Sequence, residues 1–207
     1  MTLRLKSSAA SISILAGLSL TGCATTASDD TDYAPPPSQT TPTPPPTSVT
    51  PPLAAQELVL TEWRKSEVKD DCAPASFLKT GQPMNARRAD FSGGWAVAFD
   101  LPNLRSAYGI AGTGSLDKDG TTEAVRRGEI ERWPHVIDLP ALPNPSYAGY
   151  GLSGFTPYPA DNKGGVGLKS GAYLRIGGQK CLYNVWSSIS REHLESLLKN
   201  IRMIEQR

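Results

Sequence analysis

Serine and histidine are the residues that could supply a nucleophile and a base, and the chain contains one near match to a hydrolase pattern. Residues 151–154 read Gly-Leu-Ser-Gly, whereas the Gly-x-Ser-x-Gly nucleophile elbow needs glycine where Phe155 stands. His193 falls in the first turn of a predicted helix, and His135 follows a proline in a proline-rich segment. Capping or surface roles are expected for both histidines. We therefore expect a protein that is not an enzyme. Among three hypotheses of function, an uncharacterised hydrolase ranks third.

Two segments, one acidic and one rich in glycine, are candidates for metal and nucleotide binding. Residues 117–120 (Asp-Lys-Asp-Gly) begin like a calcium loop, but the EF-hand pattern then needs Gly and Glu where Thr122 and Gly128 stand. Residues 109–114 are rich in glycine without matching Gly-x-Gly-x-x-Gly, and no helix is expected after them. We expect no metal and no nucleotide cofactor.

Aromatic side chains alternate with glycines in residues 145–167, which we predict to be a long loop. Long ordered loops often carry function, and aromatic rings can stack on sugars or anchor a partner protein. The alternative is that these rings only cover a small core beneath the loop. The candidate binding residues are Tyr147, Tyr150, Phe155 and Tyr158.

The first 22 residues have the pattern of a bacterial export signal. The cations Arg4 and Lys6 precede an apolar stretch that serines interrupt and that ends at Gly22. A transmembrane helix needs about 20 largely apolar residues, so this stretch is too short to span a bilayer. Removal of residues 1–22 would leave 19 basic and 20 acidic residues. That balance argues against a nucleic-acid partner, which normally requires a clustered basic surface.

Residues 20–23, Leu-Thr-Gly-Cys, resemble the lipobox of bacterial lipoproteins, and the resemblance covers residues 1–23 only. It implies cleavage before Cys23, a diacylglyceryl group on the Cys23 thiol and a palmitate-type acyl chain on the new amino group. Ala24 at the next position implies sorting to the outer membrane, with the domain facing the periplasm or the cell surface. Several acyl chains would anchor the protein stably.

If Cys23 carries lipid, two thiols remain in an oxidising compartment, Cys72 and Cys181. The simplest prediction is a structural disulfide between them. A reactive pair is the alternative, but the chain has no Cys-x-x-Cys spacing that would lower a thiol pKa.

The composition divides the chain into a signal (1–22), a lipidated tether (23–53) and a single extracytoplasmic domain (54–207). The tether is rich in Thr, Ser and Pro and has almost nothing to bury, so it is predicted to be disordered. Its proline runs favour polyproline II, which makes it a spacer between membrane and domain. A proline-recognition ligand is the less favoured interpretation.

The elements that would position any site are clearest near the end of the domain. Ser190 is a predicted N-cap, and Leu194, Leu197, Leu198, Ile201 and Ile204 recur at helical spacing. Residues 172–176 and 179–186 flank Gly177-Gly178, which predicts a hairpin with a two-residue turn and with Cys181 facing the core. That register would set Arg175 opposite Lys180, a mildly unfavourable pair.

A second hairpin is predicted around residues 101–104, from residues 94–100 and 105–111. Residues 57–68 fit helix and strand equally. Strands followed by a closing helix predict an α+β domain, a mostly antiparallel sheet with the C-terminal amphipathic helix packed on one face.

The resulting functional hypothesis is a lipid-anchored envelope protein with a non-enzymatic binding or support domain that acts through its Gly/Tyr loop. Its candidate partners are the membrane, through the anchor, and either cell-wall glycan or an envelope protein. An inhibitor or immunity-type lipoprotein that docks on a partner protein is the alternative hypothesis.

Overall fold

The computed structural model describes residues 53–81, 85–91 and 93–206. The predicted signal peptide, Cys23 and the tether up to residue 52 lie outside the described residues. No helix in the described ranges is both long enough and apolar enough to cross a membrane.

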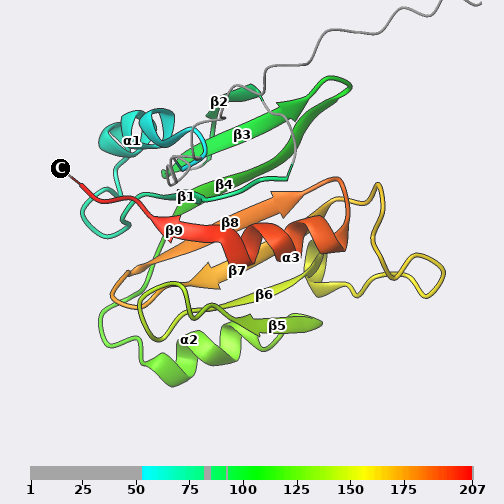
Figure 1. Cartoon of the computed structure of the whole chain (residues 1–207). Coiled ribbons are helices and arrows are strands. Elements are labelled where there is room, and N and C mark those ends of the chain that lie inside the picture. Colours follow the sequence, from blue (N-terminus) through cyan, green and yellow to red (C-terminus); the bar gives the residue numbers. More distant parts are fainter. Residues whose placement is uncertain (1–52, 82–84, 92, 207) are drawn as a thin grey trace, which may run out of the picture. The chain divides into compact units, whose positions relative to one another are not determined.

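The described chain forms an α+β domain, as predicted (Figure 1). Its main sheet has seven antiparallel strands in the order β2-β3-β4-β8-β7-β6-β5, and β1 pairs with β9 in a small second sheet. The elements are α1 (Gln56–Lys65), β1 (Ala75–Phe77), β2 (Asn85–Ala89), β3 (Trp95–Leu101), β4 (Leu104–Leu116), α2 (Glu123–Ile130), β5 (His135–Asp138), β6 (Tyr147–Leu152), the 3-10 turn η1 (Ser153–Phe155), β7 (Ser170–Arg175), β8 (Cys181–Ser187), α3 (Arg191–Asn200) and β9 (Ile201–Met203).

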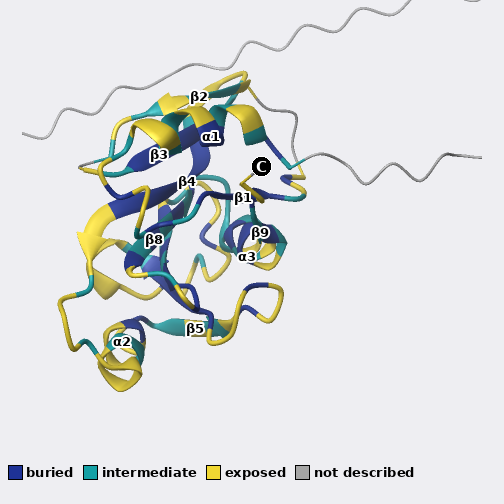
Figure 2. Cartoon of the chain, turned by 90° about the vertical axis from the view of Figure 1, so that its left-hand side faces the viewer, coloured by how far each residue is buried: buried dark blue, intermediate teal, exposed yellow. Residues whose placement is uncertain are grey.

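The two faces of the main sheet are covered differently. Helices α1 and α3 contribute to one continuous hydrophobic core with alternate residues of β3, β4, β7 and β8, and we call this side the core face. Helix α2 packs against β6 and β7 on the opposite side, which we call the groove face. Figure 2 shows buried residues along β3 and β4 and mostly exposed residues on α2.

Helix α3 begins as predicted and ends earlier. The Ser190 hydroxyl accepts a hydrogen bond from the backbone N–H of His193 (3.1 Å), which caps the first turn. Ile201 and Ile204 were predicted to continue the helical stripe, but the helix ends at Asn200 and Ile201 starts β9. Pairing of β9 with β1 satisfies the backbone there, so both isoleucines are buried without being helical.

The β7–β8 hairpin has the predicted faces but a different register. Leu174 lies opposite Tyr183, two residues away from the pairing that a two-residue turn would give. The backbone N–H of Gly177 instead donates to the Pro143 carbonyl (3.3 Å) and to the Ser146 hydroxyl (3.0 Å). Packing of the turn against a neighbouring segment therefore widens the loop.

The predicted like-charge pair does not occur in this register. Arg175 donates to Asp117 (2.8 Å) and to Glu129 (2.6 Å), while Lys180 forms an ion pair with Asp71 (3.0 Å). The longer loop thus gives each cation carboxylate partners from other elements.

The remaining predictions divide into confirmed and missed elements. The second hairpin is confirmed as β3–β4. Of residues 57–68, which fitted helix and strand equally, those up to Lys65 belong to helix α1 and the last three form a bend and turn. Residues 145–167, predicted to be a loop, contain strand β6, and residues 123–130 form the unpredicted helix α2. Strand β6 is rich in glycine, which strands usually avoid. Its hydrogen bonding to β5 and β7 on both sides outweighs that preference.

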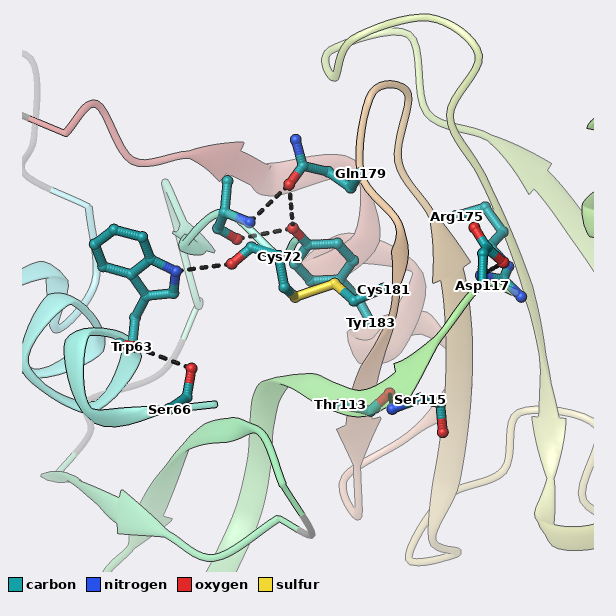
Figure 3. The surroundings of a disulfide bond; sticks show 11 residues. Trp63, Ser66, Cys72, Thr113, Ser115, Asp117, Arg175, Gln179, Cys181 and Tyr183 are labelled. Carbon is teal, nitrogen blue, oxygen red and sulfur yellow. Dashed lines mark hydrogen bonds and ion pairs between the residues drawn. A yellow bond between two sulfur atoms is a disulfide. The ribbon is translucent and has the colours of Figure 1, made fainter. Parts of the chain in front are cut away.

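The predicted disulfide is present between Cys72 and Cys181 (Figure 3). Both cysteines are fully buried, and the bond joins the segment after α1 to strand β8. The Trp63 indole N–H donates to the Cys72 carbonyl (2.7 Å), and the Tyr183 hydroxyl donates to the Ala73 carbonyl (2.8 Å). The disulfide therefore lies inside a hydrogen-bonded junction rather than at the surface.

Candidate functional site

Three of the four predicted loop aromatics point into the protein. Tyr147, Tyr150 and Tyr158 are 1%, 5% and 8% exposed, whereas Phe155 is 39% exposed. Tyr147 and Tyr150 belong to β6, where the Tyr147 hydroxyl reaches helix α2 and the Tyr150 hydroxyl reaches helix α3. The alternative that these rings cover a core therefore holds for the tyrosines, and only Phe155 remains available at the surface.

The buried tyrosines connect strands to helices through carboxylates. The Tyr150 hydroxyl donates to Glu195 of α3 (2.6 Å), and the Tyr147 hydroxyl donates to Glu123 of α2 (2.7 Å). Burial, together with the neighbouring carboxylate, raises the pKa of each tyrosine. Arg191 also donates to Glu195 (2.7 Å). These contacts hold the two helices on opposite faces of β6.

A groove of about 320 Å³ opens on the groove face beside the exposed ring of Phe155. Ligand pockets typically begin at about 300 Å³, so the volume suits a small polar molecule or one unit of a chain. We call this hollow the aromatic groove. Its lining residues are Trp133, Ser153, Gly154, Phe155, Lys169, Ser170, Gly171, Tyr173, Asn184 and Trp186.

The strand register brings the groove residues together. Tyr173 lies directly opposite Asn184, and Gly171 lies directly opposite Trp186, across the β7–β8 ladder. Directly opposed residues share a face of the sheet, so all four are on the face away from the main core. A Cβ atom at Gly171 would meet no atom within 4 Å, which makes this glycine the open floor of the groove.

Two further glycines let the tryptophans lie close to the sheet. A methyl group at Gly109 would overlap the Trp186 indole, whose N–H donates to the Ser106 carbonyl (3.3 Å). A Cβ atom at Gly149 would lie 2.5 Å from Cδ1 of Trp133. The indoles therefore occupy space that any larger residue would take, which fixes the walls of the groove.

The aromatic walls contact one another. The Trp133 ring centroid lies 4.8 Å from that of Phe155 in an edge-on arrangement and 5.7 Å from that of Tyr173. Phe155 has a positive φ of 61° and follows Gly154 with a φ of 71°, so this part of η1 departs from the negative φ values of a regular 3-10 turn. The Asn184 amide N–H donates to the Ala172 carbonyl (3.1 Å), which orients the side chain.

A second hollow of about 350 Å³ adjoins the aromatic groove and shares three of its rings, Trp133, Phe155 and Tyr173. Arg132 lines this second hollow, and its guanidinium lies 4.6 Å from the centroid of the Phe155 ring. The two hollows together form a continuous surface of rings edged by polar groups.

The candidate hydrolytic residues are not brought together. Ser153 lies in η1 rather than between a strand and a helix, while His135 stacks against Tyr150 and Tyr158. His193 contacts a different serine, with Nδ1 3.0 Å from the Ser187 hydroxyl. That pair resembles a nucleophile with its base, but Ser187 is fully buried and no substrate reaches it. Burial also lowers the pKa of His193.

Metal binding has no candidate in the described ranges, where no group of three or more His, Cys, Asp or Glu side chains is placed to hold an ion. The Asp117–Gly120 segment binds through Asp117 to Arg175 and Arg126 (2.8 Å each). Its acidic oxygens thus serve ion pairs between elements.

Sequence reasoning missed most of the groove residues, although a signal for them existed. The predicted core face of the last hairpin implies that Tyr173, Asn184 and Trp186 lie on the other face. Large aromatics on the outward side of a strand indicate a binding surface more directly than a glycine-rich loop does. Trp133 had no such signal because its place depends on the unpredicted helix α2.

No family model, no curated protein and no solved structure matches this chain.

Proposed function

We propose that this protein is a lipid-anchored envelope protein whose domain binds sugar chains in the aromatic groove, without catalysing a reaction. The observation that carries the proposal is the open hollow with Trp186, Tyr173 and Phe155 at its sides, Asn184 beside them and Gly171 as its floor.

The chemistry of this lining suits a sugar ring. A pyranose has apolar C–H faces and polar hydroxyl edges, and the amphipathic side chains of Tyr and Trp match that combination. A few fixed polar groups in a mostly apolar hollow set the orientation of a ligand. Asn184, which donates to the Ala172 carbonyl, is such a group here, and the described lining includes no carboxylate in this hollow.

The proposed location at the cell envelope depends on the N-terminal residues of the chain. The lipobox-like residues 20–23 favour lipidation of Cys23 and an outer-membrane position facing the periplasm. The Cys72–Cys181 disulfide supports an extracytoplasmic position, since disulfides persist mainly in oxidising compartments. A proline-rich tether would let the domain reach the cell wall, a glycan network, from such an anchor.

The test is co-sedimentation of the processed chain, carrying Cys23→Ser so that it lacks lipid, with purified cell-wall sacculi. Gly171→Leu fills the floor of the groove with a side chain whose Cβ meets no neighbouring atom. We expect at least tenfold weaker binding for this variant, which corresponds to roughly 1.4 kcal/mol or more.

The matched control is Gly128→Leu, because a Cβ atom at Gly128 also meets nothing within 4 Å and Gly128 lies on the exposed side of α2. Binding by the control should equal that of the unmodified domain. Sacculi that bind neither protein, or bind the Gly171→Leu variant fully, would remove the groove as a glycan site. A lipid-specific mass shift on Cys23 in the full-length protein tests the anchor separately.

A further inference from the structure

We infer that the aromatic groove selects sugar chains that bear carboxylates over neutral ones, a conclusion that rests on the proposed sugar binding and names its ligand class. The observation behind it is a pair of cations, Lys169 and Arg132, at the two hollows that share the aromatic rings.

Neither of these cations is neutralised within the part of the chain that the structure describes. No carboxylate there lies within ion-pair distance of Lys169, which is exposed just before β7, or of Arg132, which is exposed after α2. The contact given for the Arg132 guanidinium is the face of the Phe155 ring, at 4.6 Å. Both cations therefore keep hydrogen-bond donors for a ligand.

The one carboxylate that lines the two hollows is already paired. Glu129 accepts a hydrogen bond from Arg175 (2.6 Å), and Arg175 in turn binds Asp117 (2.8 Å). Arg175 is largely buried while the Glu129 side chain is half exposed, and this ion pair compensates the negative charge of Glu129. An anionic ligand would thus meet two available cations and little opposing charge.

The rings and the cations have separate tasks in this arrangement. Tyr173, Trp133 and Phe155 belong to both hollows, so sugar rings would stack along them from one hollow to the next. The planar guanidinium of Arg132 suits bidentate binding of a carboxylate, while the Lys169 ammonium acts as a point charge. Carboxylates of two kinds would fit, those of uronic acids and those of lactyl ethers on cell-wall sugars.

The experiment is calorimetric titration of the processed Cys23→Ser chain with four probes. They are a neutral N-acetylglucosamine oligomer, an oligogalacturonate, a soluble muramic-acid-containing glycan of similar length, and polyglutamate. We expect at least one carboxylated sugar to bind roughly tenfold tighter than the neutral oligomer at low salt, the size that two partly exposed charge pairs would give. Added salt should reduce this ratio, since it screens exposed charges.

The decisive variant is Lys169→Gln with Arg132→Gln, which removes both cations and leaves the rings. In this variant the affinity for carboxylated sugars should fall to the affinity that the same variant shows for the neutral oligomer, so that the preference disappears. The matched control is Lys163→Gln with Arg105→Gln, which removes one exposed lysine and one exposed arginine outside the two hollows. It should retain the full preference.

The outcomes separate this inference from the proposed function. Equal binding of neutral and carboxylated sugars would overturn the preference and leave sugar binding in place. Polyglutamate bound as tightly as the sugars would overturn it too, because charge alone would then suffice. If no sugar binds at all, the proposed function itself fails.

Discussion

The two faces of the main sheet use aromatic residues in opposite ways. On the core face, Phe99 stacks on Tyr108 with ring centroids 4.9 Å apart, and both rings are fully buried. On the groove face, Tyr173 and Trp186 come from the same sheet but remain partly exposed. The difference teaches that residue type alone does not separate a core from a binding surface. What decides is whether a helix or another strand covers that part of the face.

The largest effect on stability should come from a substitution that creates a cavity on the core face. Phe99→Ala should lower the free energy of unfolding by about 3–5 kcal/mol, because removal of a buried phenyl ring leaves a cavity. Tyr173→Ala should cost about 1 kcal/mol, because its ring is partly exposed. Urea denaturation measures both. Sugar binding should show the reverse order. The Tyr173→Ala variant should lose sugar binding, whereas the Phe99→Ala variant should retain it as long as it is folded. Similar losses of stability in the two variants would remove the distinction between the faces.

The second effect concerns the covalent closure of the core face. Replacing both Cys72 and Cys181 by alanine opens a loop with a sequence separation of 109 residues. We expect the free energy of unfolding to fall by about 2–4 kcal/mol, a size typical for a structural disulfide. The folded variant without the disulfide should bind sacculi nearly as well as the unmodified protein, since the groove lies on the other face. Denaturation with and without reductant provides the control, because the variant should not respond to reductant. Loss of binding in the still-folded variant would show that the two faces are coupled.

The smallest effect is a pH dependence at Glu195, which ties β6 to α3 on the core face. Burial acts to raise the pKa of Glu195, but hydrogen bonds from Tyr150 and Arg191 outweigh it and hold the pKa below the ordinary value of 4.5. A carboxylate with a lowered folded-state pKa stabilises the native state above its unfolded pKa, and that contribution is lost as the pH falls through the folded value. Glu195→Gln should therefore cost about 1 kcal/mol at neutral pH.

The difference between Glu195→Gln and the unmodified domain should shrink as the pH falls below 4.5. Denaturation curves across this range measure it, with Glu192→Gln, an exposed position on the same helix, as the control. A difference that does not depend on pH would contradict the assignment of the charged Tyr150–Glu195–Arg191 contact.

Sequence patterns anticipated local features well and the candidate site poorly. The Ser190 cap, the faces of the β7–β8 hairpin and the Cys72–Cys181 pair depend on neighbouring residues or on simple counting, and each is present. The end of α3 was misplaced because β9 pairs with β1, a contact between segments more than a hundred residues apart. The binding loop was misjudged for a different reason: β6 is rich in glycine, and it becomes a strand because it pairs with β5 on one side and β7 on the other.

Patterns in the sequence predict the α+β class, the closing helix and the partners of the disulfide. The first two follow from periodicity and composition, which act over short distances, and the cysteine pairing follows from the prediction that Cys23 carries the lipid. Which aromatic rings are buried and which line a groove depends on how the strands and helices pack. Trp133, Phe155, Tyr173 and Trp186 come from separate parts of the chain. Gly109 and Gly149 leave room for the two indoles, while Gly171 leaves the floor of the groove open. Such a surface depends on strand order and helix placement, which no local pattern encodes.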